Sequence, residues 1–161
     1  MEIYLLRHGA AENAQPGRPD AERRLTEEGK KKTAEVVKMA RRTGLEAPLV
    51  ISSPYVRAVE TARIAMKELG VRDLIQSSAL VPHGGPEAVW QEMKDYRDAR
   101  ALLLAGHEPL MGRLVAYLLN SPALQVEMKK SAMVRIGVEG VRVAPHGVLR
   151  WMITPRLAEQ I

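Results

Sequence analysis

Chemically capable side chains stand directly after short apolar runs in this sequence. The first run, Ile3 to Leu6, is followed at once by Arg7, His8 and Gly9. An arginine offers a planar fork of N–H donors that suits an oxyanion, and a histidine can act as a nucleophile or carry a proton near neutral pH. Gly9 allows backbone angles that other residues avoid, so the chain can turn sharply there. The group predicts a site for an anionic ligand if other segments contribute to it.

Two later apolar runs end in polar residues in the same way. Leu49 to Ile51 leads into Ser52-Ser53-Pro54 and then Arg57, and Ala101 to Ala105 leads into Gly106 and His107. The serines suit a turn and a helix cap rather than catalysis. Arg57 falls in the first turn of the helix that follows, where its charge opposes the helix dipole. A bound anion would remove that conflict.

Arg7, His8, Arg57 and His107 are therefore expected to converge. Ligands of open α/β sheets bind just beyond the carboxyl ends of the strands. Two guanidiniums and two imidazoles there suit a phosphoryl group, whose transfer depends mainly on positioning and charge stabilisation. The histidines show no ligand pair at helical spacing, so we expect neither a metal nor another cofactor.

The elements needed to position these residues can be read from the pattern of apolar residues and turn signals. Short apolar runs alternate with helical segments, which predicts an α/β fold: a three-layer sandwich with a mostly parallel central sheet flanked by helices. We expect one domain over residues 1–161. The predicted strands are 3–6, 49–51, 74–81, 101–105, 132–138 and 148–153, and the predicted helices are 26–44, 53–70, 87–97 and 110–119.

Composition narrows the classes of protein that remain. The chain has 161 residues, 46% of them hydrophobic, and no cysteine, which excludes disulfides and thiolate metal sites. No apolar run approaches the ~20 residues of a membrane span and no secretory signal is apparent, so we expect a cytoplasmic protein without a membrane partner. The net charge of +5 favours anionic partners, but only 4% of residues are aromatic, which argues against nucleic acid.

Three motifs resemble those of the histidine phosphatase superfamily. They are Arg7-His8-Gly9, the segment Ser52-Ser53-Pro54-x-x-Arg57-Ala58-x-x-Thr61-Ala62, and Gly106-His107. Within the superfamily the chain is most similar to the compact SixA-type phosphohistidine phosphatases. Asp20-x-x-Arg23-x-Leu25-Thr26-x-x-Gly29 matches their segment after the first motif. The resemblance extends over nearly the whole length.

The resemblance implies a role for each matched residue. His8 would be the nucleophile and become transiently phosphorylated, while Arg7, Arg57 and His107 would bind the phosphoryl oxygens. Water would then hydrolyse the intermediate. The second nitrogen of His8 must donate to an acceptor that the sequence does not identify, and His107 would be more useful as an imidazolium.

The source of a proton for the leaving group is less clearly marked. Asp20 matches the acidic position of the SixA-type group and is a possible proton donor, and the alternative is a loop carboxylate paired with Arg18 or Arg23. Arg23 is a further candidate for contact with the substrate or its phosphate, or else a solvated surface residue. A phosphorylated imidazole titrates near neutrality and can carry its own proton, so it has less need of an acid than an alkyl phosphate.

We therefore expect a phosphohistidine phosphatase that acts on a phosphohistidine-containing domain of a phosphorelay protein. One alternative is a small-molecule phosphomonoesterase of the same superfamily. Another is a non-catalytic phosphoprotein-binding module, although binding alone would not need the nucleophile.

Overall fold

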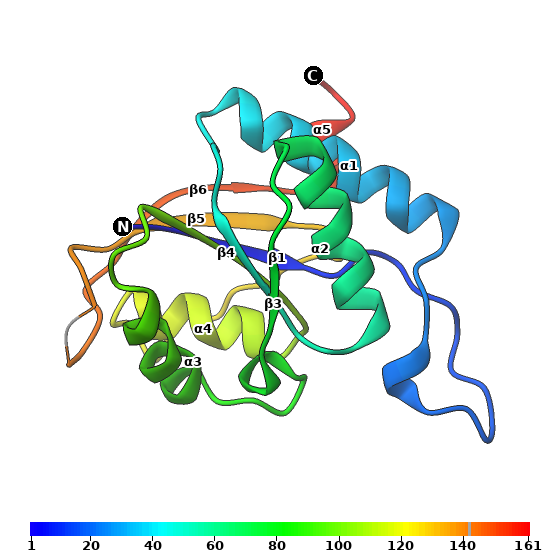
Figure 1. Ribbon diagram of the computed structural model, residues 1–161, viewed down its shortest axis with the longest axis horizontal. Coiled ribbons are helices and arrows are strands. Elements are labelled where there is room, and N and C mark those ends of the chain that lie inside the picture. The colour runs from blue at the N-terminus through cyan, green and yellow to red at the C-terminus, as the bar shows by residue number, and fades with distance from the viewer. Residues whose placement is uncertain (142) are drawn as a thin grey trace.

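A six-stranded sheet lies between two layers of helices in the computed structural model, which describes residues 1–141 and 143–161 (Figure 1). The strands, in the order β3-β2-β4-β1-β5-β6 across the sheet, are β1 (Glu2–Arg7), β2 (Leu49–Ser52), β3 (Leu74–Gln76), β4 (Ala101–Gly106), β5 (Met133–Gly137) and β6 (Val148–Ile153). The first four are parallel, whereas β5 is antiparallel to β1 and β6 is antiparallel to β5. This arrangement confirms the predicted α/β fold with a mostly parallel sheet.

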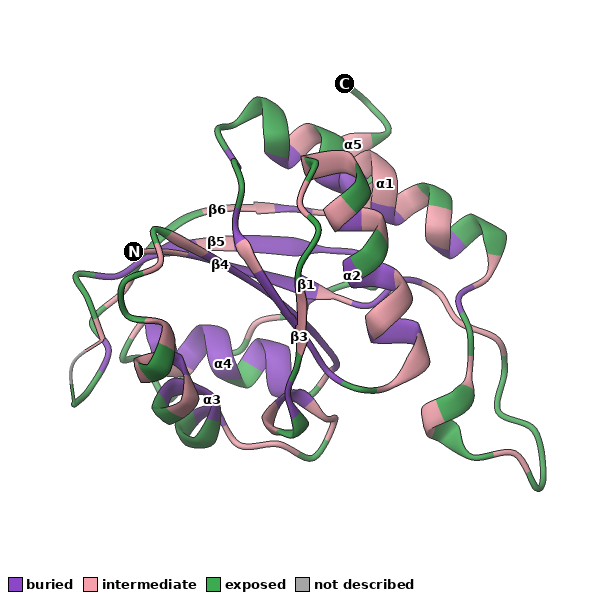
Figure 2. Ribbon diagram, viewed as in Figure 1, coloured by how far each residue is buried: buried purple, intermediate pink, exposed green. Residues whose placement is uncertain are grey.

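The helices cover both faces of the sheet because side chains alternate along the buried strands. They are α1 (Glu27–Arg42), α2 (Val56–Leu69), α3 (Pro86–Met93), α4 (Leu110–Leu118) and the short α5 (Pro155–Ala158). Ile3 and Leu5 of β1 pack with the side chains of α3 and α4, and Tyr4 and Leu6 pack with those of α1 and α2. Figure 2 shows the buried residues concentrated in the central strands and on the inner faces of the helices. None of the helices within the described residues has the length and apolar character needed to cross a membrane.

The predicted start of α1 is confirmed. The Thr26 hydroxyl accepts the N–H of Gly29 at 3.0 Å, and Glu27 and Glu28 occupy the first turn, where negative charge stabilises the helix dipole. Arg41 and Arg42 occupy the last turn. The end of the helix is also as predicted, because Gly44 takes a left-handed conformation with φ +94°.

The beginning of α2 differs from the prediction. Val56 is its first residue and Tyr55 its N-cap, so the helix begins later than the predicted residue 53, and the expected cap by Ser53 is wrong. The Ser53 hydroxyl accepts the N–H of Tyr55 at 3.3 Å within the preceding turn. The serine therefore ends the strand and holds the turn, and the helix begins after that turn is complete.

The third strand is shorter than predicted. It stops at Gln76, because the Ser77 hydroxyl accepts the N–H of Ala79 at 3.1 Å and thereby starts a 3-10 turn over Ser78–Leu80. The same hydroxyl bonds to Glu92 on α3 at 2.5 Å. A local turn thus ends this strand, and the side chain that caps the turn also joins it to α3.

A close backbone contact fixes the loop after β1 against α1. A Cβ atom added at Gly29 would lie 2.2 Å from the carbonyl oxygen of Ala10, and one added at Gly9 would lie 2.8 Å from the carbonyl oxygen of Gly29. Real side chains cannot approach backbone atoms so closely. The two glycines therefore allow the residues that follow His8 to lie directly on the first turn of α1.

Replacing Gly29 with alanine should destabilise the protein, although alanine is the better helix former by ~1 kcal/mol. The added methyl group would push the Ala10 segment away from α1, and we expect a net loss of about 1–3 kcal/mol in the free energy of unfolding. Urea denaturation of Gly29→Ala measures this loss. Lys31→Ala, on the exposed face of the same helix, is the control and should change stability by less than about 0.5 kcal/mol. An alanine variant as stable as the wild type would contradict the close contact.

Candidate active site

The pairing of β1 with β4 brings the two strand-end histidines together. Arg7 is opposite Gly106 in the parallel register, and the backbone N–H of His8 donates to the carbonyl of Gly106 at 2.9 Å. The rings of His8 and His107 consequently lie with their centroids 5.0 Å apart. On the other side of β4, the N–H of Ser53 donates to the carbonyl of Ala105 at 3.0 Å. The ends of three adjacent strands thus meet at one point, as the sequence predicts.

The His8 ring is held in one orientation by its own backbone. Its Nδ1 lies 2.7 Å from the carbonyl oxygen of Gly9, which can only accept, so Nδ1 carries the proton. This carbonyl is the acceptor that the sequence did not identify. Nε2 is left with a lone pair and accepts the Nε–H of Arg57 at 3.4 Å. Burial, followed by the charges of Arg57, Arg7 and Lys130, lowers the pKa of His8 to about 4, although its bond to Gly9 opposes this shift.

His107 is also neutral in the free protein. It is 1% exposed, and burial, followed by the charges of His8, Arg57 and Arg7, lowers its pKa to about 3. Its Nε2 lies 2.8 Å from the Ser53 hydroxyl, and the edge of the Tyr55 ring packs against it. The expected imidazolium is thus not the state of the free site. A bound dianion would favour it by reversing the sign of the local charge.

Arg57 projects from the first turn of α2 and is almost completely buried. Its guanidinium donates from Nη1 to the backbone carbonyl of Asp20 at 2.8 Å and from Nη2 to the carboxylate of Asp20 at 3.0 Å. It also lies over the Tyr55 ring, 5.1 Å from the ring centroid. Arg57 is a positive charge at the positive end of the helix dipole, which is unfavourable. In the free protein, the carboxylate of Asp20 offsets this charge.

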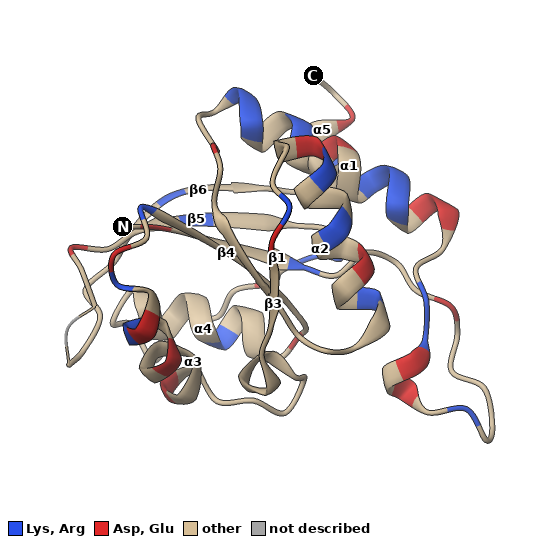
Figure 3. Cartoon of the chain, in the orientation of Figure 1, with Lys and Arg blue, Asp and Glu red and all other residues tan. Residues whose placement is uncertain are grey.

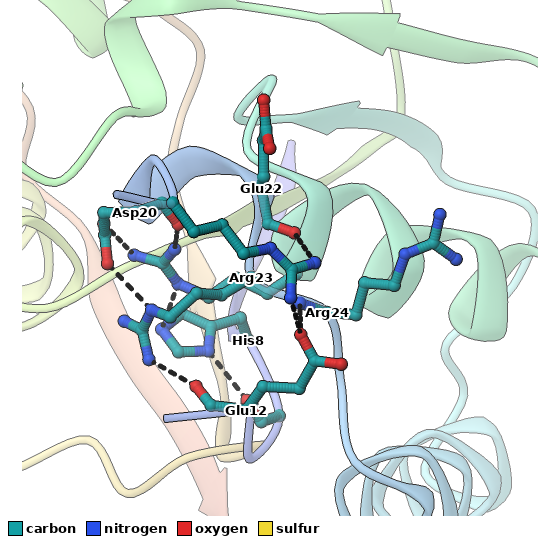
Figure 4. Close-up of polar contacts among 9 residues, drawn as sticks. His8, Glu12, Asp20, Glu22, Arg23 and Arg24 are labelled. Carbon is teal, nitrogen blue, oxygen red and sulfur yellow. Dashed lines mark hydrogen bonds and ion pairs between the residues drawn. The ribbon is translucent and has the colours of Figure 1, made fainter. Parts of the chain in front are cut away.

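Asp20 lies in a 3-10 turn, Asp20–Glu22, at the rim of the site (Figure 4). Its carboxylate also accepts the Nε–H of Arg23 at 2.8 Å, and Arg23 donates to the carbonyl of Glu12 at 2.9 Å. Burial raises the pKa of Asp20, but the hydrogen bonds and charges of Arg23 and Arg57 outweigh it, and the pKa is lower than usual. The free site therefore holds Asp20 as a carboxylate between two guanidiniums, and its role as a proton donor stays a prediction.

Arg7 lies on the other side of His8. Its Nη1 donates to the backbone carbonyl of Met128 at 2.6 Å, which orients the guanidinium, and burial lowers its pKa against the opposing charges of Glu108 and Glu127. Its Nε is buried and has no hydrogen-bond partner. Arg7 thus keeps an unused donor beside the nucleophile.

Unpaired polar atoms are concentrated at this site. Within the described residues, only three buried side-chain nitrogen or oxygen atoms lack a hydrogen-bond partner, and two of them are Arg7 Nε and His107 Nδ1. The third is Trp151 Nε1. Leaving such a group unpaired costs about 1–3 kcal/mol. An oxyanion bound next to His8 would offer the acceptors that these two residues lack.

The supporting roles of two residues, Thr61 and Ser131, were not predicted from the sequence. The Thr61 hydroxyl accepts the N–H of Gly9 at 3.2 Å and donates to the Arg57 carbonyl at 2.7 Å, so it joins the loop after β1 to α2. Ser131 donates its N–H to the His8 carbonyl at 3.1 Å, and its hydroxyl bonds to Thr33 of α1 at 2.8 Å. The helical spacing of Arg57 and Thr61 was a usable signal for the first of these residues. No local signal marks Ser131.

The structure thus brings together all the residues that the sequence singled out. His8, Arg57 and His107 form the buried centre, Arg7 flanks it, and Asp20 and Arg23 form the rim. Ser53, expected to serve the turn and the helix cap rather than catalysis, also contacts the ring of His107. Over the described part of the chain, no three His, Cys, Asp or Glu side chains gather as possible metal ligands.

Comparison with known proteins agrees with this geometry. The family model of the histidine phosphatase superfamily (branch 1) matches residues 3–81. A curated relative, an uncharacterised protein of Picosynechococcus sp., is 29% identical and the match covers 91% of this chain and 90% of that protein.

Solved structures share the fold over almost the whole chain. The protein histidine phosphatase SixA, complexed with tungstate, superposes with a TM-score of 0.83 at 23% identity, covering 97% of this chain and 98% of that one. A phosphoserine phosphatase from Entamoeba histolytica, in complex with 3-phosphoglyceric acid, superposes with a TM-score of 0.72 at 15% identity, covering 97% and 98%. The chain thus resembles the histidine phosphatase superfamily over residues 3–81 and shares the fold of these structures over almost its whole length.

The buried neutral histidines should make stability depend on pH. Imidazoles of the unfolded chain bind protons near pH 6.5, whereas His8 resists protonation down to about 4 and His107 down to about 3. The unfolded state therefore gains protons first as the pH falls, and stability is lost below pH 6.5. Each histidine should remove about 2 kcal/mol from the free energy of unfolding between about pH 7.5 and pH 5.

Urea denaturation of His8→Asn at these two pH values tests this expectation. The variant should lose about 2 kcal/mol less than the wild type on acidification. His83→Asn, which changes an exposed histidine, is the control and should behave as the wild type does. The same acid sensitivity in His8→Asn and in the wild type would show that His8 is not held neutral.

Proposed function

We propose that the protein is a phosphohistidine phosphatase that removes the phosphoryl group from a histidine of a phosphorelay protein through a phospho-His8 intermediate. The match of residues 3–81 to the histidine phosphatase superfamily supports a phosphatase hydrolase. The observation that carries the proposal is the state of His8: a neutral, oriented ring whose unprotonated Nε2 accepts from a buried guanidinium at 3.4 Å. A nucleophile needs that lone pair, whereas a residue that only binds phosphate would be more useful protonated.

In the first step, His8 Nε2 attacks the phosphorus atom of the substrate. A P–N bond to Nε2 forms as the P–N bond to the substrate imidazole breaks, and the electron pair of the broken bond stays on the leaving nitrogen. Arg57 and Arg7 neutralise the phosphoryl oxygens during transfer, and His107 adds a donor from the neighbouring strand. The Gly9 carbonyl stabilises the positive charge that His8 acquires, because it accepts the Nδ1 proton at 2.7 Å.

In the second step, water attacks phosphorus from the side opposite His8. A P–O bond forms, the bond to Nε2 breaks with its electron pair returning to the ring, and the proton of the water passes to phosphate or to solvent. Free phosphate then leaves and His8 is neutral again. No change in the tautomer of His8 is needed at any stage, since Nδ1 keeps its proton throughout.

The leaving group favours phosphohistidine as the substrate. An imidazole phosphate titrates near neutrality, so its other ring nitrogen can already carry a proton and the ring departs as neutral imidazole. An alkyl phosphate must instead receive a proton as it leaves. In the free protein, Asp20 is ionised and paired with Arg57, so it is not ready to supply one.

A small-molecule phosphomonoesterase is the second candidate. It is favoured by the carboxylate of Asp20 at the rim, which could receive a proton once a phosphoryl group draws Arg57 away. The similar fold of the Entamoeba histolytica phosphoserine phosphatase is compatible with it. Faster turnover of sugar phosphates than of a phosphohistidine protein would favour this candidate over the first.

His8→Ala should abolish turnover of a phosphohistidine protein, at least about 10³-fold, because the variant lacks the atom that attacks phosphorus. Rapid quenching of the wild type with labelled substrate should trap an acid-labile phosphoenzyme. The variant should trap none, and its circular dichroism spectrum should match that of the wild type. Label trapped equally on both proteins would place the adduct elsewhere, and its absence from a wild type that turns over would rule out the covalent route.

Asp20→Asn should slow hydrolysis of an aryl phosphate more than hydrolysis of phosphohistidine. If Asp20 donates a proton, we expect a loss of about 10²-fold on the aryl phosphate and a loss within about threefold on phosphohistidine. Steady-state kcat on both substrates measures the difference. Asp98→Asn, at an exposed carboxylate, is the control and should change neither rate. Equal losses on the two substrates would show that Asp20 only positions Arg57.

A further inference from the structure

A charged cleft of about 450 Å³ adjoins the site on the side of Arg7. It is bounded by the start of α1 and by the segment between α4 and β5, and Figure 3 shows the basic residues along α1. Its charged lining residues are Arg7, Lys32, Lys129, Lys130, Glu28 and Glu127. Since Arg7 belongs both to this cleft and to the surroundings of His8, a ligand with two anionic groups could occupy both places at once.

The lysines of the cleft differ in whether their charge is already neutralised. Lys32 pairs with Glu28 at 2.9 Å, and Lys129 pairs with Glu127. The Lys130 side chain is exposed and forms no hydrogen bond or ion pair with any residue that the structure describes. The cleft thus retains an uncompensated ammonium group next to an arginine whose Nε also lacks a partner.

The backbone holds Lys130 close to the nucleophile. The next residue, Ser131, adopts a left-handed conformation with φ +63° and donates its N–H to the carbonyl of His8 at 3.1 Å. Ala132 closes a turn by donating to the carbonyl of Lys129 at 2.9 Å. The Lys130 ammonium is near enough for its charge to contribute to the low pKa of His8. A tethered backbone therefore presents an exposed cationic side chain close to the reacting ring.

We propose that this cleft, with Lys130 as its main contact, binds a carboxylate of an acidic residue that flanks the phosphohistidine in the partner protein. The inference rests on the proposed function and specifies the substrate further. A carboxylate matches the uncompensated charge of the cleft, and its attachment close to the phosphohistidine matches the closeness of Lys130 to His8. Complementary charges of this kind add modest affinity and strong selectivity between partners.

The test compares two peptides that differ in one property. Both carry a chemically phosphorylated histidine, one with glutamate on either side and the other with glutamine. The measured quantity is the ratio of kcat/KM for the acidic peptide to kcat/KM for the neutral one, in which any effect on the phosphoryl step itself cancels. We expect the wild type to prefer the acidic peptide by about threefold to fivefold, as one partly exposed ion pair allows, and to lose this preference at high salt.

Reversing the charge of Lys130 should reverse the preference. We expect the ratio to fall by about tenfold in Lys130→Glu, because attraction is replaced by repulsion. The control is Lys67→Glu, which makes the same change at an exposed lysine on α2 with no ion pair in the described structure, and its ratio should match the wild type.

The possible results distinguish failure of the carboxylate site from failure of the proposed phosphatase function. Equal ratios in the wild type and Lys130→Glu, or an equal fall in Lys67→Glu, would overturn the carboxylate site while leaving the phosphatase proposal intact. Failure of the wild type to hydrolyse either peptide would overturn the proposed function and this inference with it.

Discussion

The parallel pairing of β1 with β4 is the constraint on which the site depends. With Arg7 opposite Gly106, the residues that follow each strand are His8 and His107, and both rings enter the same buried space. A shift of one residue along either strand would turn one ring to the other face of the sheet. The apolar side chains of β1 and β4 prevent such a shift, because they pack into separate clusters on the two faces. The packing of the core therefore fixes the strand register, and the register places the two histidines of the site.

Burial then determines the charge state of what the register assembles. Two imidazoles and two guanidiniums share a space with little access to water, and the imidazoles are the groups that can give up their charge. Both therefore remain neutral, while Arg57 keeps its charge with the carboxylate of Asp20 as its counter-ion. The positive charges around His8 help to keep its Nε2 unprotonated. The same charges attract an anion to that nitrogen.

The central architecture was predictable because it follows from local patterns. Continuous apolar runs mark strands covered on both faces, and Thr26 with its two glutamates marks the start of α1. The end of β3 was misplaced because Ser77 ends the strand through its own turn and a bond to Glu92, neither of which the apolar pattern reveals. The start of α2 was misplaced because a Ser-Ser-Pro sequence is compatible with either a cap or a turn.

The residues of the site were predictable from the sequence, but the hydrogen bonds that hold them were not. Motifs named the six candidate residues. The strand-end argument brought Arg7, His8, Arg57 and His107 together, whereas Asp20 and Arg23 followed from the family resemblance alone. His8 Nδ1 and the Arg7 guanidinium each bond to a backbone carbonyl. Every residue has such a carbonyl, so the sequence does not mark which one accepts. The sequence offered Asp20 as a possible proton donor or, alternatively, as a loop carboxylate paired with Arg18 or Arg23. It does pair with Arg23, but its contact with Arg57 depends on how a loop folds over the strand ends.

Binding of an anion and the protonation of His107 must be linked in such a site. Without a ligand, neighbouring positive charge and burial both disfavour the imidazolium. A phosphoryl dianion between the two rings would replace repulsion by attraction, so His107 should gain affinity for a proton when the anion binds. His8 does not respond in the same way, because its Nδ1 proton is already held by Gly9 and its Nε2 is occupied by phosphorus during the reaction. Two identical side chains thus acquire different roles from their hydrogen-bond partners: a carbonyl for the nucleophile, and the Ser53 hydroxyl for its neighbour, which leaves the other nitrogen of His107 unpaired.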